Sequence, residues 1–405
     1  MSIAIAIAGL AFLILIHEAG HFFVARAVRM RPRRFYIFFP PALVKWTRGG
    51  IEYGIGSIPL GGYVKIPGMH RPAARDLEVG LAPAAAEAPW LERHLAPATR
   101  ALEEGRGEAA RAAVGDLHDA VRRAELSEPA ARSAERTVTD VDDALSPEAY
   151  WRAPAWKKIA VIFAGPGVNL AFAIGLLAVV FALGVPVAQT VESVNAGSPA
   201  QAAGLRAGDR IVAIDGDKVT PVLTERVPSR ISGTEGRPVT LAVERDGREV
   251  VLEPARARLD DGAYRLGFTL GSTEERFGPT QSLEYALRET WAVTEATGSA
   301  LGRIVTGSSR DEVSSPVGIV QGSSQALDVD YRIYLRILAL ISLSLALLNL
   351  LPLLPLDGGH IAFSLLEAVR GRAIPRVAYE RASAIGLALV LVLFFIGLTN
   401  DIGRL

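Results

Sequence analysis

The sequence predicts a multi-pass α-helical membrane protein with about four transmembrane helices, a membrane-associated β element and a small inserted β domain. Half of its 405 residues are hydrophobic and the mean hydropathy is +0.28, which is too apolar for an ordinary soluble enzyme. Charged residues still make up 21% of the chain, so domains outside the membrane must accompany the spans. The formal net charge is zero, which gives no field that would favour nucleic acid as a partner. There is no cysteine, so a metal ion would need histidine and carboxylate ligands.

The first predicted span, residues 1–28, contains two histidines at a metal-binding spacing. Residues 3–16 carry no charge, and the apolar run resumes after the histidines, so the segment is long enough to cross a bilayer. His17 and His21 are four residues apart and share one face of a helix, where both imidazoles can reach a single ion. Glu18 is rotated off that pair and can take a proton from a water molecule that the metal polarises. The pattern therefore predicts a zinc site with Glu18 as its catalytic carboxylate.

Ionisable groups at membrane depth are a functional indication in themselves, because each is costly there unless it is paired or used. The alternative is a cleavable signal peptide with an incidental histidine pair. Signal peptides begin with a basic region and end in a small-residue cleavage site. This segment instead begins Met1-Ser2-Ile3, and its basic residues follow the apolar run. A membrane-embedded site is the interpretation that fits both ends of the segment.

Residues 29–70 are predicted to form a cytoplasmic, membrane-associated β element. Because basic residues follow the first span, its end is expected in the cytoplasm and the N-terminus outside. Residues 50–66 are rich in Ile, Tyr and Val, are punctuated by Gly and Pro, and have no helical period. They form either a plain surface hairpin or an exposed strand edge that holds a substrate segment extended near the metal. In the second case, Gly61 and Gly62 are expected to help position the substrate.

The rest of the chain alternates between membrane and soluble segments. The predicted order is 71–157, a cytoplasmic helical insertion rich in Ala, Arg and Glu; 158–188, the second transmembrane helix; 189–272, the inserted β domain; 273–332, an amphipathic, extracytoplasmic connector; 333–356, the third transmembrane helix; 357–380, a cytoplasmic loop; and 381–400, the fourth transmembrane helix. Arginines in and just after the last loop agree with the orientation expected from the first span.

Helix-breaking residues surround a candidate third metal ligand. The run 349–360 contains two prolines and two glycines, and irregular backbone at membrane depth is tolerated where it lines a cavity or is buried in protein. Catalytic zinc takes three protein ligands and leaves one place for water, so Asp357 is predicted to be the third ligand. A similar interruption, Gly165-Pro166-Gly167, is predicted in the second span beside Asn169. That amide serves helix packing, the bracing of the metal site, or both, and Asn169 is also expected to help position the substrate.

The inserted β domain has a recognisable order of short motifs. Residues 193–254 suggest a short helix followed by strands with an Asp-Gly turn. The segment closely resembles a PDZ domain of the bacterial, circularly permuted kind in the order Ser198-Pro199-Ala200, Ala203-Gly204-Leu205, Gly208-Asp209 and Ile214-Asp215-Gly216. Such domains accept a chain end or an extended strand at a sheet edge, so the resemblance implies peptide ends as ligands. The alternative is a rigid spacer that binds nothing.

Taken together, the motifs resemble the site-2 protease family, and most closely its bacterial regulator-of-sigma-E type. The likeness covers nearly all of the chain except residues 71–145 and is carried by His17-Glu18-x-x-His21, Pro59-Leu60-Gly61-Gly62-Tyr63-Val64-Lys65, Gly165-Pro166-x-x-Asn169 and Asn349 followed by Leu356-Asp357-Gly358-Gly359-His360. It implies intramembrane zinc proteolysis in the inner membrane with His17, His21 and Asp357 as zinc ligands. It also implies that Asn349 engages the substrate. The implied substrates are single-span membrane proteins, namely anchored anti-sigma factors or remnant signal peptides.

Two other functional classes compete with the protease. One is a silent scaffold that binds peptides through its PDZ-like domain and keeps zinc for structure. Structural zinc sites are normally closed by four protein ligands, whereas three are expected to converge here. The other is a metal transporter, which would need polar ligands along several spans, and the second and fourth spans offer almost none. The sequence therefore favours an intramembrane zinc metalloprotease.

Overall fold

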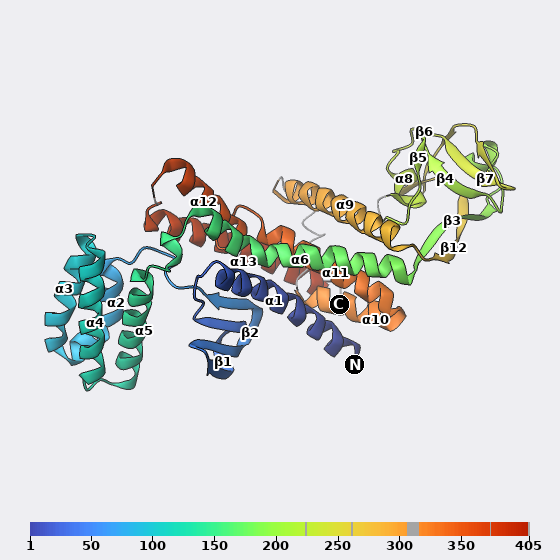
Figure 1. The fold of residues 1–405 in the computed structure, drawn as a ribbon. Helices are drawn as coiled ribbons and strands as arrows, with labels where there is room; N and C mark the ends of the chain where they lie inside the picture. Colours follow the sequence, from blue (N-terminus) through green and yellow to red (C-terminus); the bar gives the residue numbers. More distant parts are fainter. Residues whose placement is uncertain (223–224, 261, 306–315, 373, 404–405) are drawn as a thin grey trace. The chain divides into compact units, whose positions relative to one another are not determined.

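Four helices are long and apolar enough to cross a membrane in the computed structural model, which describes residues 1–405 except 223–224, 261, 306–315, 373 and 404–405. They are α1 (Ser2–Ala27), α6 (Ala155–Leu183), α11 (Tyr331–Asn349) and most of α13 (Arg376–Gly403) (Figure 1). Their long uncharged runs leave many large apolar side chains exposed, as expected for helices whose solvent is lipid. The prediction of about four transmembrane helices is confirmed in this respect.

Several predicted boundaries are wrong. Helix α6 ends at Leu183, and residues 184–188, predicted as membrane, begin strand β3 (Val185–Val194) after Gly184, whose φ is 111°. Helix α11 ends at Asn349 instead of residue 356, because prolines follow that cannot donate the next helical hydrogen bonds. Helix α13 begins at Arg376, earlier than residue 381, because the Pro375 carbonyl oxygen already accepts a hydrogen bond from the Ala378 amide over 2.9 Å.

Two predicted interruptions also differ from the structure. Helix α6 runs without a break through Pro166, because neighbouring groups in a packed membrane protein can satisfy the backbone that a proline frees. The predicted loop 357–380 contains a further helix, α12 (Asp357–Arg370). Its glycines Gly358 and Gly359 were expected to break a helix, but both lie within its first turn.

The chain divides into two compact units, which are described separately. The first unit comprises Ala8–Asn169 and Leu345–Leu393. In it, β1 (Arg34–Arg48) and β2 (Ile51–Lys65) form an antiparallel hairpin closed by Gly49 and Gly50, which both have positive φ.

The pairing within this hairpin is irregular, and one segment of β1 pairs with two different segments of β2. Residues 34–37 pair with residues 52–55 on one side and with residues 62–65 on the other. Within the described pairing, residues 62–65 pair only with residues 34–37, and they therefore lie at an edge of the sheet. Peptide groups at a sheet edge can pair with a further strand.

Four helices form the insertion in this unit: α2 (Ala74–Glu87), α3 (Glu92–Glu103), α4 (Gly107–Arg123) and α5 (Glu128–Leu145). Apolar side chains recur at helical spacing and bury a separate core that includes Leu81, Leu117 and Val138. The insertion is attached to the hairpin by charged pairs. Arg33 donates from Nε to Asp143 Oδ1 over 3.0 Å, and Lys65 pairs with Asp140.

The second unit comprises Met1–Ile7, Leu170–Ser344 and Phe394–Leu405. Its β domain has a main sheet in the order β12-β3-β4-β7-β8, with β5 paired to β4. The main-sheet strands after β3 are β4 (Arg210–Ile214), β5 (Asp217–Lys218), β7 (Leu241–Arg245), β8 (Arg248–Val251) and β12 (Phe268–Glu275). The chain enters through β3 and leaves through β12, its antiparallel neighbour (Figure 1). This pairing explains how a whole domain is inserted between two membrane segments.

Small elements complete the β domain. Two further strand pairs are present, and their members are β6 (Pro238–Val239), β9 (Ala255–Arg256), β10 (Arg258–Asp260) and β11 (Ala263–Arg265). Helices α7 (Pro199–Ala202) and α8 (Val227–Ser232) pack on the sheet through buried residues such as Ala200 and Ile231. Asp209 is nearly fully buried and accepts from Arg245 over 2.6 Å, and its pKa is lowered because this ion pair and a backbone donor outweigh its burial.

Two helices lie in the connector of this unit, α9 (Pro279–Val305) and α10 (Pro316–Val329). Glu289 of α9 is fully buried and accepts from Arg336 of α11 over 2.6 Å. The guanidinium carbon of Arg336 also lies over the Phe181 ring, 5.6 Å from the ring centroid. A buried pair of this kind ties α9 to the third span, since separating it would leave an unpaired buried charge.

Candidate metal centre

The first span presents two histidine nitrogens to one point. His17 Nε2 and His21 Nε2 are 3.3 Å apart, and both side chains are buried. His21 Nδ1 lies 2.8 Å from the carbonyl oxygen of Val161 on α6. A carbonyl oxygen only accepts, so Nδ1 carries the proton and Nε2 keeps its lone pair for a metal ion. The helix spacing thus supplies two ligand atoms, and α6 orients one of them.

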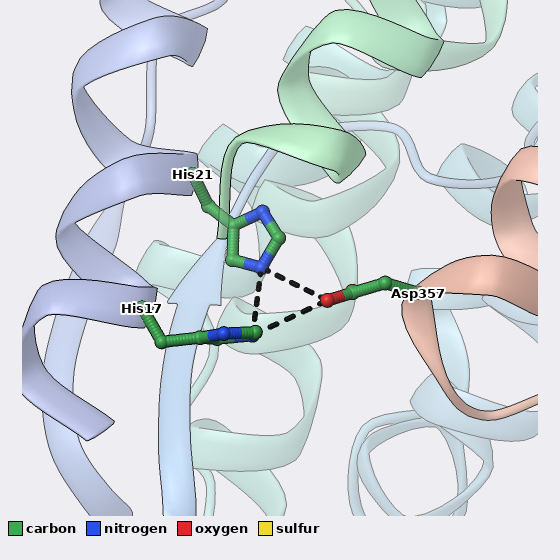
Figure 2. A group of neighbouring side chains, drawn as sticks. All are labelled: His17, His21 and Asp357. Atoms are coloured by element: carbon green, nitrogen blue, oxygen red, sulfur yellow. Dashed lines mark hydrogen bonds and ion pairs between the residues drawn. The ribbon is translucent and has the colours of Figure 1, made fainter. Parts of the chain in front are cut away.

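Asp357, the first residue of α12, completes a group of three ligand atoms. Its Oδ2 lies 3.2 Å from His17 Nε2 and 3.3 Å from His21 Nε2. Figure 2 shows the two imidazoles of α1 and the carboxylate of α12 pointing toward one another. All three residues belong to the first compact unit. Among the described residues, this is the group of histidine and carboxylate side chains whose geometry suits a metal ion.

The distances within the group fit zinc. Two ligands that are each about 2.0–2.1 Å from a tetrahedral zinc ion are about 3.3 Å apart. The three observed separations lie between 3.2 and 3.3 Å. Three acceptor atoms that converge so closely repel one another unless a cation lies between them. Two imidazoles and one carboxylate are also the donor set of many catalytic zinc sites, which leave a fourth position open.

The Asp357 side chain is largely buried beside the two imidazoles, with 17% of its surface exposed. The carboxylate is held in place by its helix. A Cβ on Gly358 would lie 2.2 Å from the Leu350 carbonyl oxygen, and one on Gly359 would lie 2.4 Å from the Leu354 nitrogen. These glycines therefore let the first turn of α12 pack against the irregular segment 350–356.

Glycines also make room on the other sides of the group. A Cβ on Gly165 of α6 would lie 2.3 Å from His21 Nε2 and 2.9 Å from His17 Nε2. A Cβ on Gly20 would lie 2.5 Å from the Ala164 carbonyl oxygen, so α1 and α6 cross in backbone contact at this level. From its sequence context, Gly165 is expected only to break a helix. Its actual position, facing both imidazoles, could not be inferred from the motif because it depends on how two helices pack.

Glu18 is half-buried beside the hairpin edge. A Cβ on Gly62 would lie 2.1 Å from Glu18 Cγ, and the Gly62 backbone amide hydrogen-bonds the Glu18 carboxylate. Gly62, predicted to position substrate, thus directly contacts the predicted general base. A residue with a side chain at position 62 would push this carboxylate away.

The other predicted positioning residues are less closely tied to the ligand group. Asn349 ends α11 and donates from Nδ2 to the Leu345 carbonyl oxygen over 2.9 Å. Asn169 is fully buried on α6, and a Cβ on Gly61 would contact the Phe39 ring at 2.9 Å. The described contacts bring Gly62 to the site, and they give Asn349 and Gly61 partners elsewhere.

The chain matches known proteins along almost its entire length. Residues 5–393 match the model of peptidase family M50. A protein of Agrobacterium fabrum named as a zinc metalloprotease is 31% identical, and the alignment covers 98% of this chain and 94% of that protein. A similarly named protein of Brucella suis is 29% identical over 97% of this chain and 93% of its own length. The regulator of sigma-E protease RseP of Salmonella typhimurium is 29% identical, with 100% and 99% covered.

These matches confirm the resemblance, the enzyme class and the zinc cofactor expected from the sequence. A scaffold that keeps zinc only for structure, and a metal transporter, are correspondingly disfavoured. The chain therefore belongs to peptidase family M50, the site-2 proteases, and is a membrane zinc metalloprotease.

Proposed function

We propose that this enzyme hydrolyses peptide bonds within or next to the transmembrane segments of single-span membrane proteins. The observation that carries the proposal is the convergence of His17 and His21, on a span, with Asp357 at mutual distances of 3.2–3.3 Å. In this proposal the three residues are the zinc ligands. The relative named regulator of sigma-E protease supports membrane-anchored anti-sigma factors as a substrate class, with remnant signal peptides as the second. The site of action is the inner membrane of the cell.

The chemistry follows from the residues around that group. A zinc ion held by His17, His21 and Asp357 would supply Lewis-acid chemistry for polarising the scissile carbonyl group and a water molecule. Glu18 accepts a proton from the attacking water and delivers it to the leaving nitrogen as the C–N bond breaks. The Gly62 amide keeps the Glu18 carboxylate oriented for both transfers. The protein thus contributes the base, its orientation and a site largely shielded from bulk water.

A substrate helix must unwind before its peptide bonds can be reached, and the hairpin offers a place for the unwound strand. Residues 62–65 form a sheet edge, and Gly62 of this edge contacts Glu18. In this proposal an extended substrate segment adds to that edge through main-chain hydrogen bonds. Gly61 and Gly62 leave room for it, Asn349 engages it where α11 gives way to irregular backbone, and Asn169 braces the ligand group from α6.

Removal of the metal should abolish proteolysis. A chelator added to the purified protein in detergent should stop cleavage of a transmembrane substrate, and added zinc should restore it, because the ligand group is the proposed catalytic centre. Asp357→Ala should lower the zinc content measured by elemental analysis, since it removes one ligand. Asp142→Ala, on the helical insertion, is the matched control and should keep full zinc and activity. Retention of stoichiometric zinc by a folded Asp357→Ala protein would exclude Asp357 as a ligand.

We expect both termini and the β domain on the outer side of the membrane, with the ligand group nearer the cytoplasmic face. Basic residues flank the ends of the spans that should be cytoplasmic, including Arg29 after α1 and Lys157 at the start of α6. A reporter that is active only in the cytoplasm should therefore be inactive when fused after Leu405. Activity of this fusion, with a control fusion in the insertion at residue 105 also active, would reverse the C-terminal assignment.

The β domain is proposed to be a PDZ-like domain that restricts access to the catalytic centre. Support comes from β12, an edge strand of the main sheet that begins at Phe268, directly after Leu266 and Gly267, a geometry that can accept a peptide end. Deleting residues 193–270 should leave cleavage of a pre-trimmed substrate intact and permit cleavage of an untrimmed one. Cleavage is measured in membranes where correct insertion has been verified. Loss of both cleavages in such membranes would argue against a gate.

A further inference from the structure

A cavity of about 930 Å³ lies where the second and fourth spans begin, on a different part of the first unit from the ligand group. Ala155 and Lys158 of α6 line it, together with Arg376 and Tyr379 of α13. The segment that links the hairpin to the insertion and helix α12 form other parts of its wall. Segments that are far apart in the sequence therefore meet at this cavity.

The lining of the cavity is strongly cationic. Its five basic side chains are Arg71, Arg75, Lys158, Arg372 and Arg376. Its two acidic residues are Glu103 and Glu367. Glu367 already pairs with Lys158, over 3.2 Å. Arg376 pairs with Glu380 over 2.8 Å and with Asp76.

Three of these cations have no such compensation. No carboxylate among the described residues lies within ion-pair distance of Arg71, Arg75 or Arg372, and all three side chains are exposed to solvent. Arg71 instead lies over the Trp151 ring, with its guanidinium carbon 5.8 Å from the centroid. The N-termini of α6 and α13 reach the cavity, but so do the C-terminal ends of α3 and α12. Because the positive and negative helix ends offset each other, the basic side chains determine the charge of the cavity, and they favour an anion.

The surroundings place this anion site at the level of lipid headgroups. Both spans start here, and aromatic side chains lie at the same level, including Trp151 in the wall and Trp156 in the first turn of α6, 62% exposed. Helix α12 lines the cavity with Ser364 and Glu367, whereas its other faces expose Leu365, Leu366 and Val369, the last 86% exposed. A cationic interior beside an apolar exterior suits an amphiphile better than a free anion.

We propose that this cavity binds the phosphate-bearing headgroup of an anionic phospholipid. Arg71 and Arg372 supply guanidinium groups that can donate paired hydrogen bonds to phosphate oxygens. Basic pockets between membrane helices on the side rich in Lys and Arg are suited to such headgroups. The acyl chains then lie along the exposed apolar side chains of α12. This site is independent of the proposed catalytic chemistry.

The test is lipid binding by the full-length protein in detergent, followed by native mass spectrometry. Phosphatidylglycerol and phosphatidylcholine with identical acyl chains are titrated separately, so that only the headgroup charge differs. Arg71→Gln combined with Arg372→Gln should weaken phosphatidylglycerol binding about 25-fold, from roughly a fivefold loss for each arginine, and leave phosphatidylcholine binding unchanged. Arg100→Gln combined with Arg248→Gln changes the net charge equally at two residues that do not line the cavity, and it should have no effect.

Two further arms make the result decisive. Arg71→Lys combined with Arg372→Lys keeps the charge and should retain most of the binding, which separates loss of charge from loss of folding. Inorganic phosphate should fail to displace the lipid at concentrations comparable with the lipid itself. Equal binding of the two lipids, unchanged binding by the glutamine variant, or displacement by phosphate at equal concentration would each overturn the proposal.

Discussion

Replacing Glu18 with glutamine should reduce proteolysis by about 10²–10⁴-fold, the usual contribution of a general acid-base residue, while zinc stays bound. The amide is nearly isosteric, but it cannot accept the proton of the attacking water. The three proposed ligands are unchanged, so the metal content should remain at the wild-type value. Cleavage of a transmembrane substrate in detergent and zinc content by elemental analysis are the two measurements.

Glu78→Gln is the matched control, because Glu78 is an exposed glutamate on α2. It undergoes the same chemical change and should keep both activity and zinc. The mutant Glu18→Gln should also still bind a substrate span, since binding at the hairpin edge does not require the carboxylate. Wild-type turnover by a zinc-loaded Glu18→Gln protein would remove Glu18 from the mechanism.

Gly165→Ala should greatly reduce the affinity of the enzyme for zinc, so that the purified variant holds little of the metal. The added methyl carbon would lie 2.3 Å from His21 Nε2, so the methyl group and the imidazole cannot both keep their positions. Moving the ring would break its hydrogen bond to the Val161 carbonyl oxygen, which orients the proposed ligand nitrogen. Changes of this kind around a metal typically reduce its affinity about 10–100-fold, and a displaced ligand reduces it further. Zinc affinity is measured by competition with a chromogenic chelator.

The control for this prediction is Gly175→Ala on the same helix, where a Cβ would meet nothing within 4 Å. Both substitutions should favour the helical backbone of α6, by up to about 1 kcal/mol in free energy. Gly175→Ala should therefore keep its zinc and unfold at an equal or higher temperature. A Gly165→Ala protein with unchanged zinc affinity would contradict the packing of α6 against the two histidines.

Local patterns were enough to identify much of this protein from its sequence. The four spans were predictable because the energy of burying a long uncharged segment in lipid depends mainly on that segment. The pairing of His17 with His21 was predictable for a similar reason, since a spacing of four residues on a helix is a local property. Asp357 was inferred from the number of ligands that zinc requires, although it lies 336 residues after His21 in the chain.

The places where prediction failed are those where distant segments pack together. Pro166 and the glycines at 358 and 359 were interpreted as helix breaks from their intrinsic preferences. Tertiary contacts gave them other roles: α6 continues through Pro166, and the two glycines allow α12 to pack tightly against residues 350–354. Intrinsic preference amounts to about 1–3 kcal/mol for one residue, which the burial of two helix faces readily exceeds.

By itself, the sequence determined the membrane character of the chain, its zinc-binding motif and the residue types available to the site. Only the tertiary structure decided that Gly165 faces both imidazoles, that Gly62 contacts Glu18, and that Arg71 and Arg372 line one cavity. The physical reason is the range of the interactions. Hydrophobic length and helical spacing act within a segment, whereas the close approach of two backbones and the convergence of charges depend on segments that meet only after folding.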